Sequence, residues 1–249
     1  MKVSIVTVCY NSAATVGRTM CSVYEQTHPD IEHIVVDGAS ADGTVRVIQE
    51  TPNRVSILLS EADHGIYDAM NKGIARASGD VLCFLNADDV YADPGVITRV
   101  AYEMAAHGLD ALFGDVAFFR AAAPQKIVRR YRSRMFSPGR IASGWMPAHP
   151  ALFMRRSIYV DLGGFKTHYR IAGDFEFVAR AFGAGTLRYR YLPEILVLMQ
   201  AGGISTAGWR SKLLLNREVM QACKENGIRT NLLKILSKYP AKFIELFLR

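Results

Sequence analysis

The first 90 residues alternate short β-branched runs with segments of helical spacing, and this alternation limits the available folds more than any other feature. The runs lie at residues 3–10, 32–40, 55–62 and 81–86, and residues 65–78 repeat apolar side chains at helical spacing. Short apolar runs of this kind are typical of strands that are buried on both faces. The order strand, helix, strand, helix predicts a parallel sheet with helices on both faces.

The pattern changes after about residue 110. Further elements are expected there: strands over 111–119, 126–132, 151–156 and 187–200, a loop rich in Gly, Pro and Ser over 137–150, and a helix over 172–185. We therefore expect a single α/β domain over 1–208, with a βαβα half (1–110) and a half that mixes strand directions (111–208). A C-terminal helical extension follows over 209–249.

Composition narrows the partners and the location. The formal net charge of +7 and the isoelectric point near 9.3 favour anionic partners. The four cysteines are scattered without a C-x-x-C pair, which argues against a zinc site and fits a reducing compartment. The first residues do not read as a signal peptide, and 18 apolar residues never run together. We expect a cytoplasmic protein without a membrane-spanning helix.

Polar side chains lie at, or just after, the carboxyl end of each of the first four expected strands. They are Asn11; Asp37; Glu61 and Asp63; and Asn86, Asp88 and Asp89. Each of them alone could be an ordinary turn or cap residue, because Asn and Asp favour such positions. The carboxyl ends of parallel strands meet at one edge of a sheet, where open α/β sheets bind their ligands. Four consecutive strands that end this way therefore favour one shared polar crevice.

The motifs restrict the ligand of this crevice. The sequence contains no G-x-G-x-x-G, no G-x-x-x-x-G-K-[ST] and no G-x-S-x-G, so a Rossmann dinucleotide site, an ordinary P-loop and a hydrolase elbow are not expected. Asp37 can accept hydrogen bonds from a base or a ribose but does not suit a phosphate. A nucleotide diphosphate would need a divalent cation, and Mg²⁺ and Mn²⁺ take carboxylates together with phosphates. Asp88 is well placed to ligate such a cation.

Several segments resemble, in order, those of family 2 glycosyltransferases of the GT-A fold. They are "VSIVTVCYNSAATVGRTMCSVYEQTH", "IVVDGASADGT", "SEADHGIYDAMNKGIARASGDVLCFLNADD" and "GDFEFVARA". The resemblance covers roughly residues 1–205. It is strongest to bacterial enzymes that build exopolysaccharide or other surface glycans, to which "GGIS" at 202–205 is also similar.

The resemblance implies an inverting, hexosyltransferase-like enzyme that moves a sugar from a nucleotide-diphosphate donor to an acceptor hydroxyl. Residues 1–110 would bind the donor, and residues 111–208 would form the acceptor side. Donor-binding residues would be Asn11, Asp37, Asp63, Asp88 and Asp89, with Asp37 at the base or ribose. The stretch Asn86-Ala87-Asp88 matches the family's Asp-x-Asp element, which carries Mn²⁺ or Mg²⁺. Because Asn replaces the first Asp, Asp88 is the expected metal ligand and Asn86 a weaker one.

On the acceptor side, Asp174 in "AGDFE" falls where the family has its catalytic base. A carboxylate within reach can take the proton of the attacking hydroxyl, although capping of the helix would also explain an Asp at this position. Glu176 is the reserve candidate. His149 could contact the diphosphate or the acceptor, or be a buried, hydrogen-bonded histidine. Trp145 could stack on a sugar face or simply pack.

The C-terminal stretch 231–249 places Lys234, Lys238 and Lys242 at steps of four among large apolar side chains. Such a basic amphipathic pattern suits an anionic membrane surface, where a lipid-linked saccharide acceptor would be found. The protein would then be peripheral on the inner face of the cell membrane. Alternatively, this stretch is a helix docked on the domain, with its lysines in solvent.

Other functions remain open on the sequence alone. A catalytically inactive nucleotide-sugar-binding protein of a glycan-assembly complex would need neither Asp88 nor Asp174, and both are present. A nucleotidyltransferase usually begins with a Gly-rich, basic phosphate loop, which "VCYNSAATVG" is not. Nucleic-acid binding is supported only by net charge and is not expected. The Q-x-x-R-W element of processive synthases is missing, so a single addition is favoured.

Overall fold

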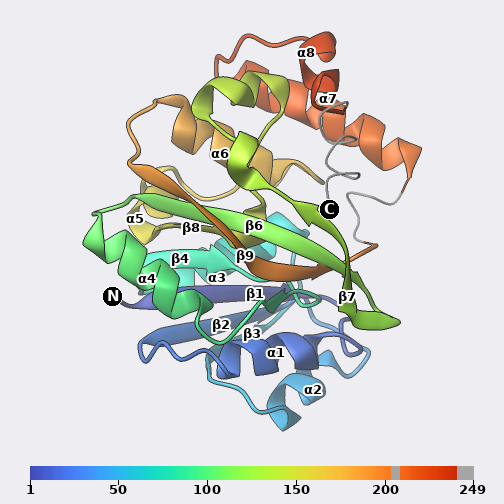
Figure 1. The fold of residues 1–249 in the computed structure, drawn as a ribbon. Coiled ribbons are helices and arrows are strands. Elements are labelled where there is room, and N and C mark those ends of the chain that lie inside the picture. Colours follow the sequence, from blue (N-terminus) through green and yellow to red (C-terminus); the bar gives the residue numbers. More distant parts are fainter. Residues whose placement is uncertain (203–207, 240–249) are drawn as a thin grey trace.

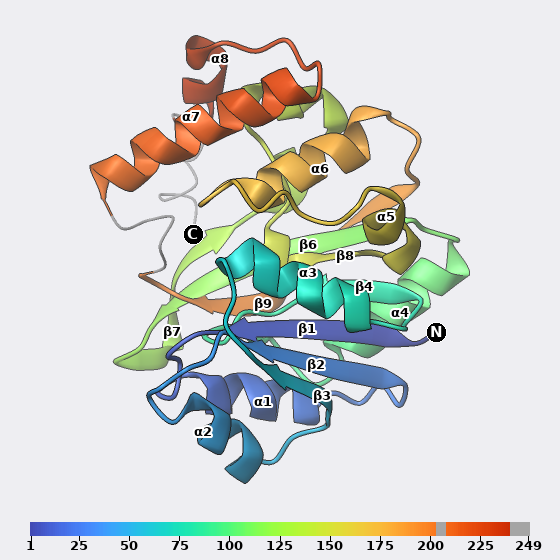
Figure 2. The ribbon, with the colours of Figure 1, turned by 180° about the vertical axis from the view of Figure 1, so that it is seen from behind.

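The computed structural model of the protein describes residues 1–202 and 208–239. One mixed, nine-stranded sheet runs through it in the order β3-β2-β1-β4-β8-β6-β9-β5, with β7 pairing β6 alongside this path. Helices cover both faces of the sheet (Figures 1 and 2). This arrangement confirms the predicted single α/β fold.

The N-terminal part of the sheet is parallel, as the alternation of strands and helices predicts. β1 (Val3–Cys9) lies between β2 (Ile31–Asp37) and β4 (Val81–Phe84), and β3 (Val55–Ser60) forms the outer strand. All side chains of β1 and β4 are buried, because helices pack on both faces. The register pairs Cys9 with Asp37 and Asp37 with Ser60, so these strands end together at one edge.

The second half adds strands in both directions. β8 (Leu152–Arg155) is antiparallel to β4 and to β6 (Ala111–Arg120), and β9 (Tyr189–Gln200) runs parallel to β6. β7 (Ala123–Tyr131) forms a hairpin with β6. The two-residue strand β5 (Val90–Tyr91) pairs with β9 and was not expected from the sequence. β5 connects the acidic segment after β4 to the second half of the sheet.

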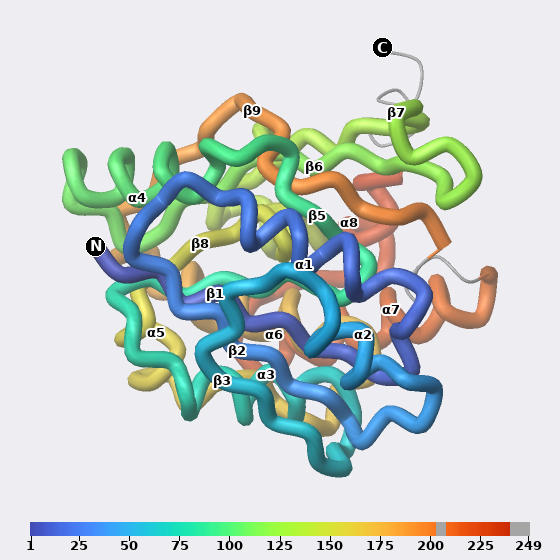
Figure 3. The backbone as a smooth tube through the Cα atoms, turned by 90° about the horizontal axis from the view of Figure 1, so that it is seen from below, coloured from blue at the N-terminus to red at the C-terminus, as the bar shows by residue number. Residues whose placement is uncertain are grey.

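The helices form layers outside the sheet. One face of the sheet carries α1 (Val16–Tyr24), α2 (Thr44–Glu50) and α4 (Val96–Ala106). The other face carries α3 (Ile66–Arg76), α5 (Arg156–Asp161) and α6 (Gly173–Gly183). Outside α6 lie α7 (Trp209–Glu225) and α8 (Leu232–Leu236) (Figure 1). Figure 3 shows α1 and α2 in front of the sheet and α6 behind it. The expected loop at 137–150 contains two short 3-10 helices, Pro138–Ser143 and His149–Ala151.

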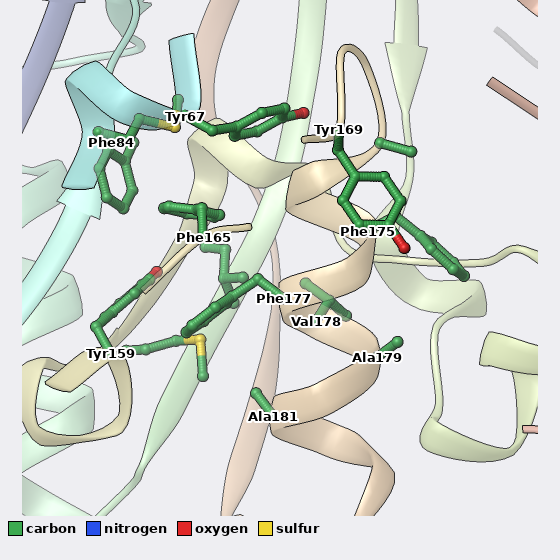
Figure 4. Close-up of a cluster of buried hydrophobic side chains, with 14 of the residues drawn as sticks. Tyr67, Phe84, Tyr159, Phe165, Tyr169, Phe175, Phe177, Val178, Ala179 and Ala181 are labelled. Carbon is green, nitrogen blue, oxygen red and sulfur yellow. The ribbon is translucent and has the colours of Figure 1, made fainter. Parts of the chain in front are cut away.

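Aromatic rings attach α6 to the sheet (Figure 4). Phe177 of α6 stacks on Tyr159 of α5 with ring centroids 4.5 Å apart, and it lies 5.0 Å from Phe165. Phe165 in turn contacts Phe84 at the end of β4, 5.3 Å away. Aromatic pairs at these separations contribute about 0.5–1.5 kcal/mol each beyond their burial. The start of α6 is therefore held firmly relative to the carboxyl end of β4.

The C-terminal helix differs from the predicted basic amphipathic surface helix. Ile235 of α8 is fully buried, and Lys238 is only 4% exposed, with its Nζ 3.5 Å from the carbonyl oxygen of Gly144. Burial lowers the pKa of Lys238 to about 8. Lys238 therefore cannot face a membrane together with Lys234, because α8 docks on the 3-10 turn at 138–143 and takes Lys238 inward. Lys242 lies outside the described residues.

Candidate functional site

Asp37 ends β2 at the carboxyl edge, but its carboxylate already has protein partners. Asp37 Oδ2 accepts hydrogen bonds from the Ser40 amide (3.0 Å) and the Ser60 hydroxyl (2.7 Å), and Oδ1 accepts from the Ser40 hydroxyl. The Cys9 thiol lies 3.6 Å from Oδ1, and the Asp37 side chain is fully buried. Asp37 therefore stabilises the turn after β2. A ligand at this edge would contact the residues of the turn, because both oxygens of the carboxylate already accept hydrogen bonds.

Asp63 and Asn11 lie around the same turn. Asp63 Oδ1 accepts a hydrogen bond from the Gly65 amide (2.8 Å), and a Cβ atom added to Gly38 would stand 2.5 Å from Asp63 Oδ2. Only glycine fits there without displacing the Asp63 carboxylate. Asn11 adopts a positive φ of 48° and accepts a hydrogen bond from the Ala41 amide (3.1 Å). Asn11, Gly38 and Asp63 thus bring the ends of β1, β2 and β3 together.

The acidic segment after β4 has one partly exposed and one buried carboxylate. Asp89 is 1% exposed, and it accepts hydrogen bonds from Asn86 Nδ2 (3.2 Å) and from the Gln200 amide at the end of β9. Burial and then the charge of Asp88 raise the pKa of Asp89 well above its ordinary value. Asp88 is partly exposed, and burial raises its pKa as well, against the opposing effect of Arg18. Asp88 is the carboxylate of this pair that a ligand can reach.

A divalent cation fits this segment only as a partner of a substrate. Within residues 1–202 and 208–239, no group of three or more His, Cys, Asp or Glu side chains could hold a metal ion. Asn86 Oδ1 is buried without a hydrogen-bond partner, next to the reachable Asp88. Mg²⁺ usually keeps several waters and binds one or two carboxylates together with substrate phosphates. One carboxylate and one orphaned amide oxygen match that requirement.

Asp174 lies in the first turn of α6, which begins on the side toward which the parallel strands point (Figure 2). Its Oδ1 accepts a hydrogen bond from the Phe175 amide (2.7 Å) and lies 3.5 Å from the Tyr67 hydroxyl. Asp174 does not cap the helix, because the cap residue is Ala172 and no side chain caps it. Burial raises the pKa of Asp174 to about 6. A carboxylate of this kind is ionised at neutral pH and is a stronger base than an ordinary aspartate.

Three other predicted residues lie in the interior: Glu176, Trp145 and His149. Glu176 is fully buried and forms ion pairs with Arg180 (2.9 Å) and Lys166 (3.1 Å); burial alone would raise its pKa, but these partners hold the pKa below the ordinary value. Glu176 is therefore not free to act as a reserve base. Trp145 is 5% exposed, so it offers no open face to a sugar.

His149 is also buried, but it is not satisfied. Its ring stacks on Phe84 with centroids 5.3 Å apart, and burial lowers the pKa of His149 to about 4. The ring is thus neutral at pH 7. Nε2 has no hydrogen-bond partner among the described residues, so the expectation of a fully hydrogen-bonded histidine does not hold for that atom. The His149 ring packs on Phe84, the last residue of β4. A contact of His149 with the substrate stays a prediction.

Several residues that approach the site carry no sequence signal. Arg18 of α1 lies near Asp88 and donates a hydrogen bond to Gln200 Oε1 (2.6 Å). Tyr67 of α3 is buried beside Asp174, and Glu218 of α7 contacts the segment just before α6. Each occupies an ordinary helical position in the sequence. Only tertiary packing brings it to the site, so a periodicity or motif search could not find it.

The fold and the site together define an α/β protein whose carboxylates gather at the carboxyl ends of parallel strands. Residues 4–162 match the family described as Glycosyl transferase family 2. A PGL/p-HBAD biosynthesis glycosyltransferase of Mycobacterium bovis is 31% identical over 210 residues, covering 81% of this chain and 78% of the relative. The chain therefore belongs to glycosyltransferase family 2.

Solved structures show the same fold. TarS 1–349 of S. aureus in complex with UDP-GlcNAc superposes with a TM-score of 0.67 at 18% identity, over 89% of this chain and 66% of that one. The mannosyltransferase PcManGT of Pyrobaculum calidifontis, in complex with GDP-Man and Mn²⁺, gives 0.65 at 18% identity, over 90% and 63%. The chain thus spans about two thirds of these proteins. The likeness confirms the predicted GT-A type fold.

Proposed function

We propose that the protein transfers a sugar from a nucleotide-diphosphate donor to an acceptor hydroxyl, with inversion, during assembly of a bacterial surface glycan. The observation that carries this proposal is the placement of two reachable carboxylates. Asp88 follows β4 in the segment before β5, Asp174 lies in the first turn of α6, and both are partly exposed. The start of α6 lies on the side of the sheet toward which the parallel strands point (Figure 2). The family supports the reaction type, and the nucleotide-sugar complexes of TarS and PcManGT support the donor class.

In the proposed reaction, Asp174 acts as the general base. The acceptor oxygen forms a bond to the anomeric carbon, the bond from that carbon to the diphosphate oxygen breaks, and the hydroxyl proton passes to Asp174. A base works best when its pKa lies near the operating pH, and the pKa of Asp174 is raised to about 6. The Phe175 amide, which donates a hydrogen bond to Oδ1 (2.7 Å), would help to orient the carboxylate.

The donor would bind over the ends of β1 to β4. Asn11 and Asp63 are the proposed contacts of the nucleoside part, and Asp37 maintains the turn that supports it. Asp88 is the proposed ligand of Mn²⁺ or Mg²⁺, with Asn86 Oδ1 as a weaker one. A divalent cation bound there would neutralise the charge that develops on the leaving diphosphate.

Nucleotide binding by Asp88 variants tests this proposal. Mn²⁺ with UDP or GDP should raise the melting temperature of the wild type, since a ligand that binds only the folded state stabilises it. Asp88→Ala should lose this stabilisation and the transfer activity. The matched control is Asp93→Ala, because Asp93 is exposed and pairs with Arg99 instead. If Asp88→Ala still responds fully to Mn²⁺ with nucleotide, or if excess chelator leaves transfer intact, the cation role is wrong.

Stabilisation by the donor, measured together with release of nucleotide diphosphate, distinguishes the enzyme from the second candidate, an inactive binding protein. A catalytically inactive nucleotide-sugar-binding protein would show donor-dependent stabilisation without release of nucleotide diphosphate, whatever acceptor extract is added. Release that depends on both donor and acceptor identifies an enzyme.

The acceptor would be a saccharide, free or linked to a lipid. Apolar side chains are exposed on the outer helices: Leu233 of α8 is 80% exposed, and Trp209 and Leu213 of α7 are 68% and 61% exposed. The exposed residues Arg210 and Lys234 lie among them. Exposed apolar and basic side chains together suit an anionic membrane surface. We propose that this side of the protein contacts such a surface. No described helix is long and apolar enough to cross a membrane.

A further inference from the structure

The segment immediately before α6 is held by a single carboxylate from α7. Glu218 Oε1 accepts a hydrogen bond from the Arg170 amide (3.0 Å), and Oε2 accepts from the amides of Ile171 (2.9 Å) and Ala172 (2.8 Å). Glu218 is 6% exposed. Three consecutive backbone donors thus converge on one buried side chain that is 46 residues or more away in sequence.

We propose that Glu218 is a positioning residue for the general base Asp174, which makes α7 part of the catalytic unit. This inference rests on the proposed function. Asp174 follows Ala172 by two residues, so the conformation of residues 170–172 sets the direction in which its carboxylate leaves the helix. The amides at the start of a helix have no intrahelical partners. The cap residue of α6 forms no side-chain cap hydrogen bond. The carboxylate of Glu218 instead accepts hydrogen bonds from the three amides that lead into the helix.

A second contact holds the same segment from the opposite side. The Tyr67 hydroxyl of α3 donates a hydrogen bond to the Ile171 carbonyl oxygen (2.8 Å). A Cβ atom on Gly173 would stand 2.7 Å from the Tyr67 ring, so the backbone passes directly over that ring. Ile171 is therefore bonded through its amide to α7 and through its carbonyl to α3. Displacement of either partner would move Asp174 relative to the ends of the strands.

The geometry argues against a direct chemical role for Glu218. Both of its oxygens are occupied by backbone amides, and the side chain is buried. It can act only through the segment that it holds and through its charge. The titratable side chains that act on Asp174 are Tyr67 from α3 and Glu218 from α7, and the negative charge of Glu218 raises the pKa of Asp174. Removing that charge lowers the pKa of Asp174.

Kinetics of Glu218→Gln test the inference. The side-chain amide keeps one acceptor but turns its NH₂ group toward backbone donors, so the segment should shift. Misplacement of a catalytic group by about 1 Å can cost about 100-fold in rate. We therefore expect kcat to fall by about that factor, with the Kd of nucleotide and Mn²⁺ unchanged. The acid limb of the pH–kcat profile should also move to lower pH. Glu225→Gln, on the same helix and paired with Lys166, should change neither.

A double-mutant cycle distinguishes positioning from general damage. If Glu218 acts through Asp174, Glu218→Gln should cause no further loss in the Asp174→Asn background, because the group that it positions is already gone. Equal losses in both backgrounds, or a parallel loss of nucleotide binding, would overturn the inference. Should Glu218→Gln not fold, Glu218→Asp serves in the same cycle. An active Asp174→Asn enzyme would instead refute the proposed base, a result independent of Glu218.

Discussion

Asp174 combines a useful chemical property with a cost in stability. Its raised pKa makes it a better base at neutral pH, and the same burial that raises the pKa penalises the ionised form in the folded state. The ordinary pKa of an aspartate is near 3.9 in unfolded chains. Folding therefore takes up a proton between about pH 4 and pH 6, and the contribution of Asp174 to stability falls as the pH rises through this window.

We predict that Asp174→Asn stabilises the protein while it lowers the transfer rate by several orders of magnitude. At pH 8 the variant should be more stable by about 1–3 kcal/mol, since one unit of pKa shift corresponds to about 1.4 kcal/mol. At pH 3.5 both proteins carry a neutral side chain, and the difference should vanish. Denaturant unfolding at the two pH values measures this. A variant that is equally destabilised at both would show that the carboxylate has a structural role.

The pH profile of the wild type provides the complementary measurement. Because a general base must be ionised, kcat should decrease below about pH 6, the pKa to which burial raises Asp174. His149 should not contribute a limb near its ordinary value, since its pKa is lowered to about 4. The pH–kcat profile of His149→Asn checks this: it should keep the limb near pH 6. Loss of that limb in the variant would assign it to His149.

Element by element, the fold was predictable wherever the signal is local. β1 to β4 were expected because each is a short apolar run bounded by turn residues, and the helices at 66–76 and 173–183 were expected from their spacing. β5 has two residues and no pattern of its own, since it exists only because β9 pairs with it. Tyr67 and Glu218 were missed for the same reason: their roles depend on elements distant in sequence.

The packing of α8 gives a prediction at this scale. Ile235 is fully buried, and truncation of a buried Ile to Ala typically costs about 2–5 kcal/mol. Ile235→Ala should therefore lower the free energy of unfolding by about this amount. Leu233→Ala, on the exposed side of the same helix, should change it by less than about 0.5 kcal/mol. Urea unfolding of both variants checks the docked position of α8; equal effects would contradict it.

At the scale of the whole molecule, the exposed side of α7 and α8 predicts reversible binding to anionic vesicles. The protein should cosediment with vesicles that contain phosphatidylserine at low salt and be released at high salt, because salt screens exposed charges. Leu233→Ser combined with Lys234→Gln should weaken the binding. Lys126→Gln removes one charge from the exposed β6–β7 hairpin and serves as the control. Equal weakening by both changes would mean that only net charge matters.

The pairing of β5 with β9 joins two segments that the ribosome translates far apart in time. Asp89 and its partner Gln200 are separated by about 110 residues, and translation at about 5–20 residues per second makes that an interval of roughly 5–20 s. In the first part of this interval, until β8 (Leu152–Arg155) has been translated, β4 lacks its neighbour β8, which leaves a strand edge open to other chains. We expect the nascent chain to need a chaperone in this interval, and a ribosome-bound chain that ends at residue 110 to lack the nucleotide site although every proposed donor contact has already been translated.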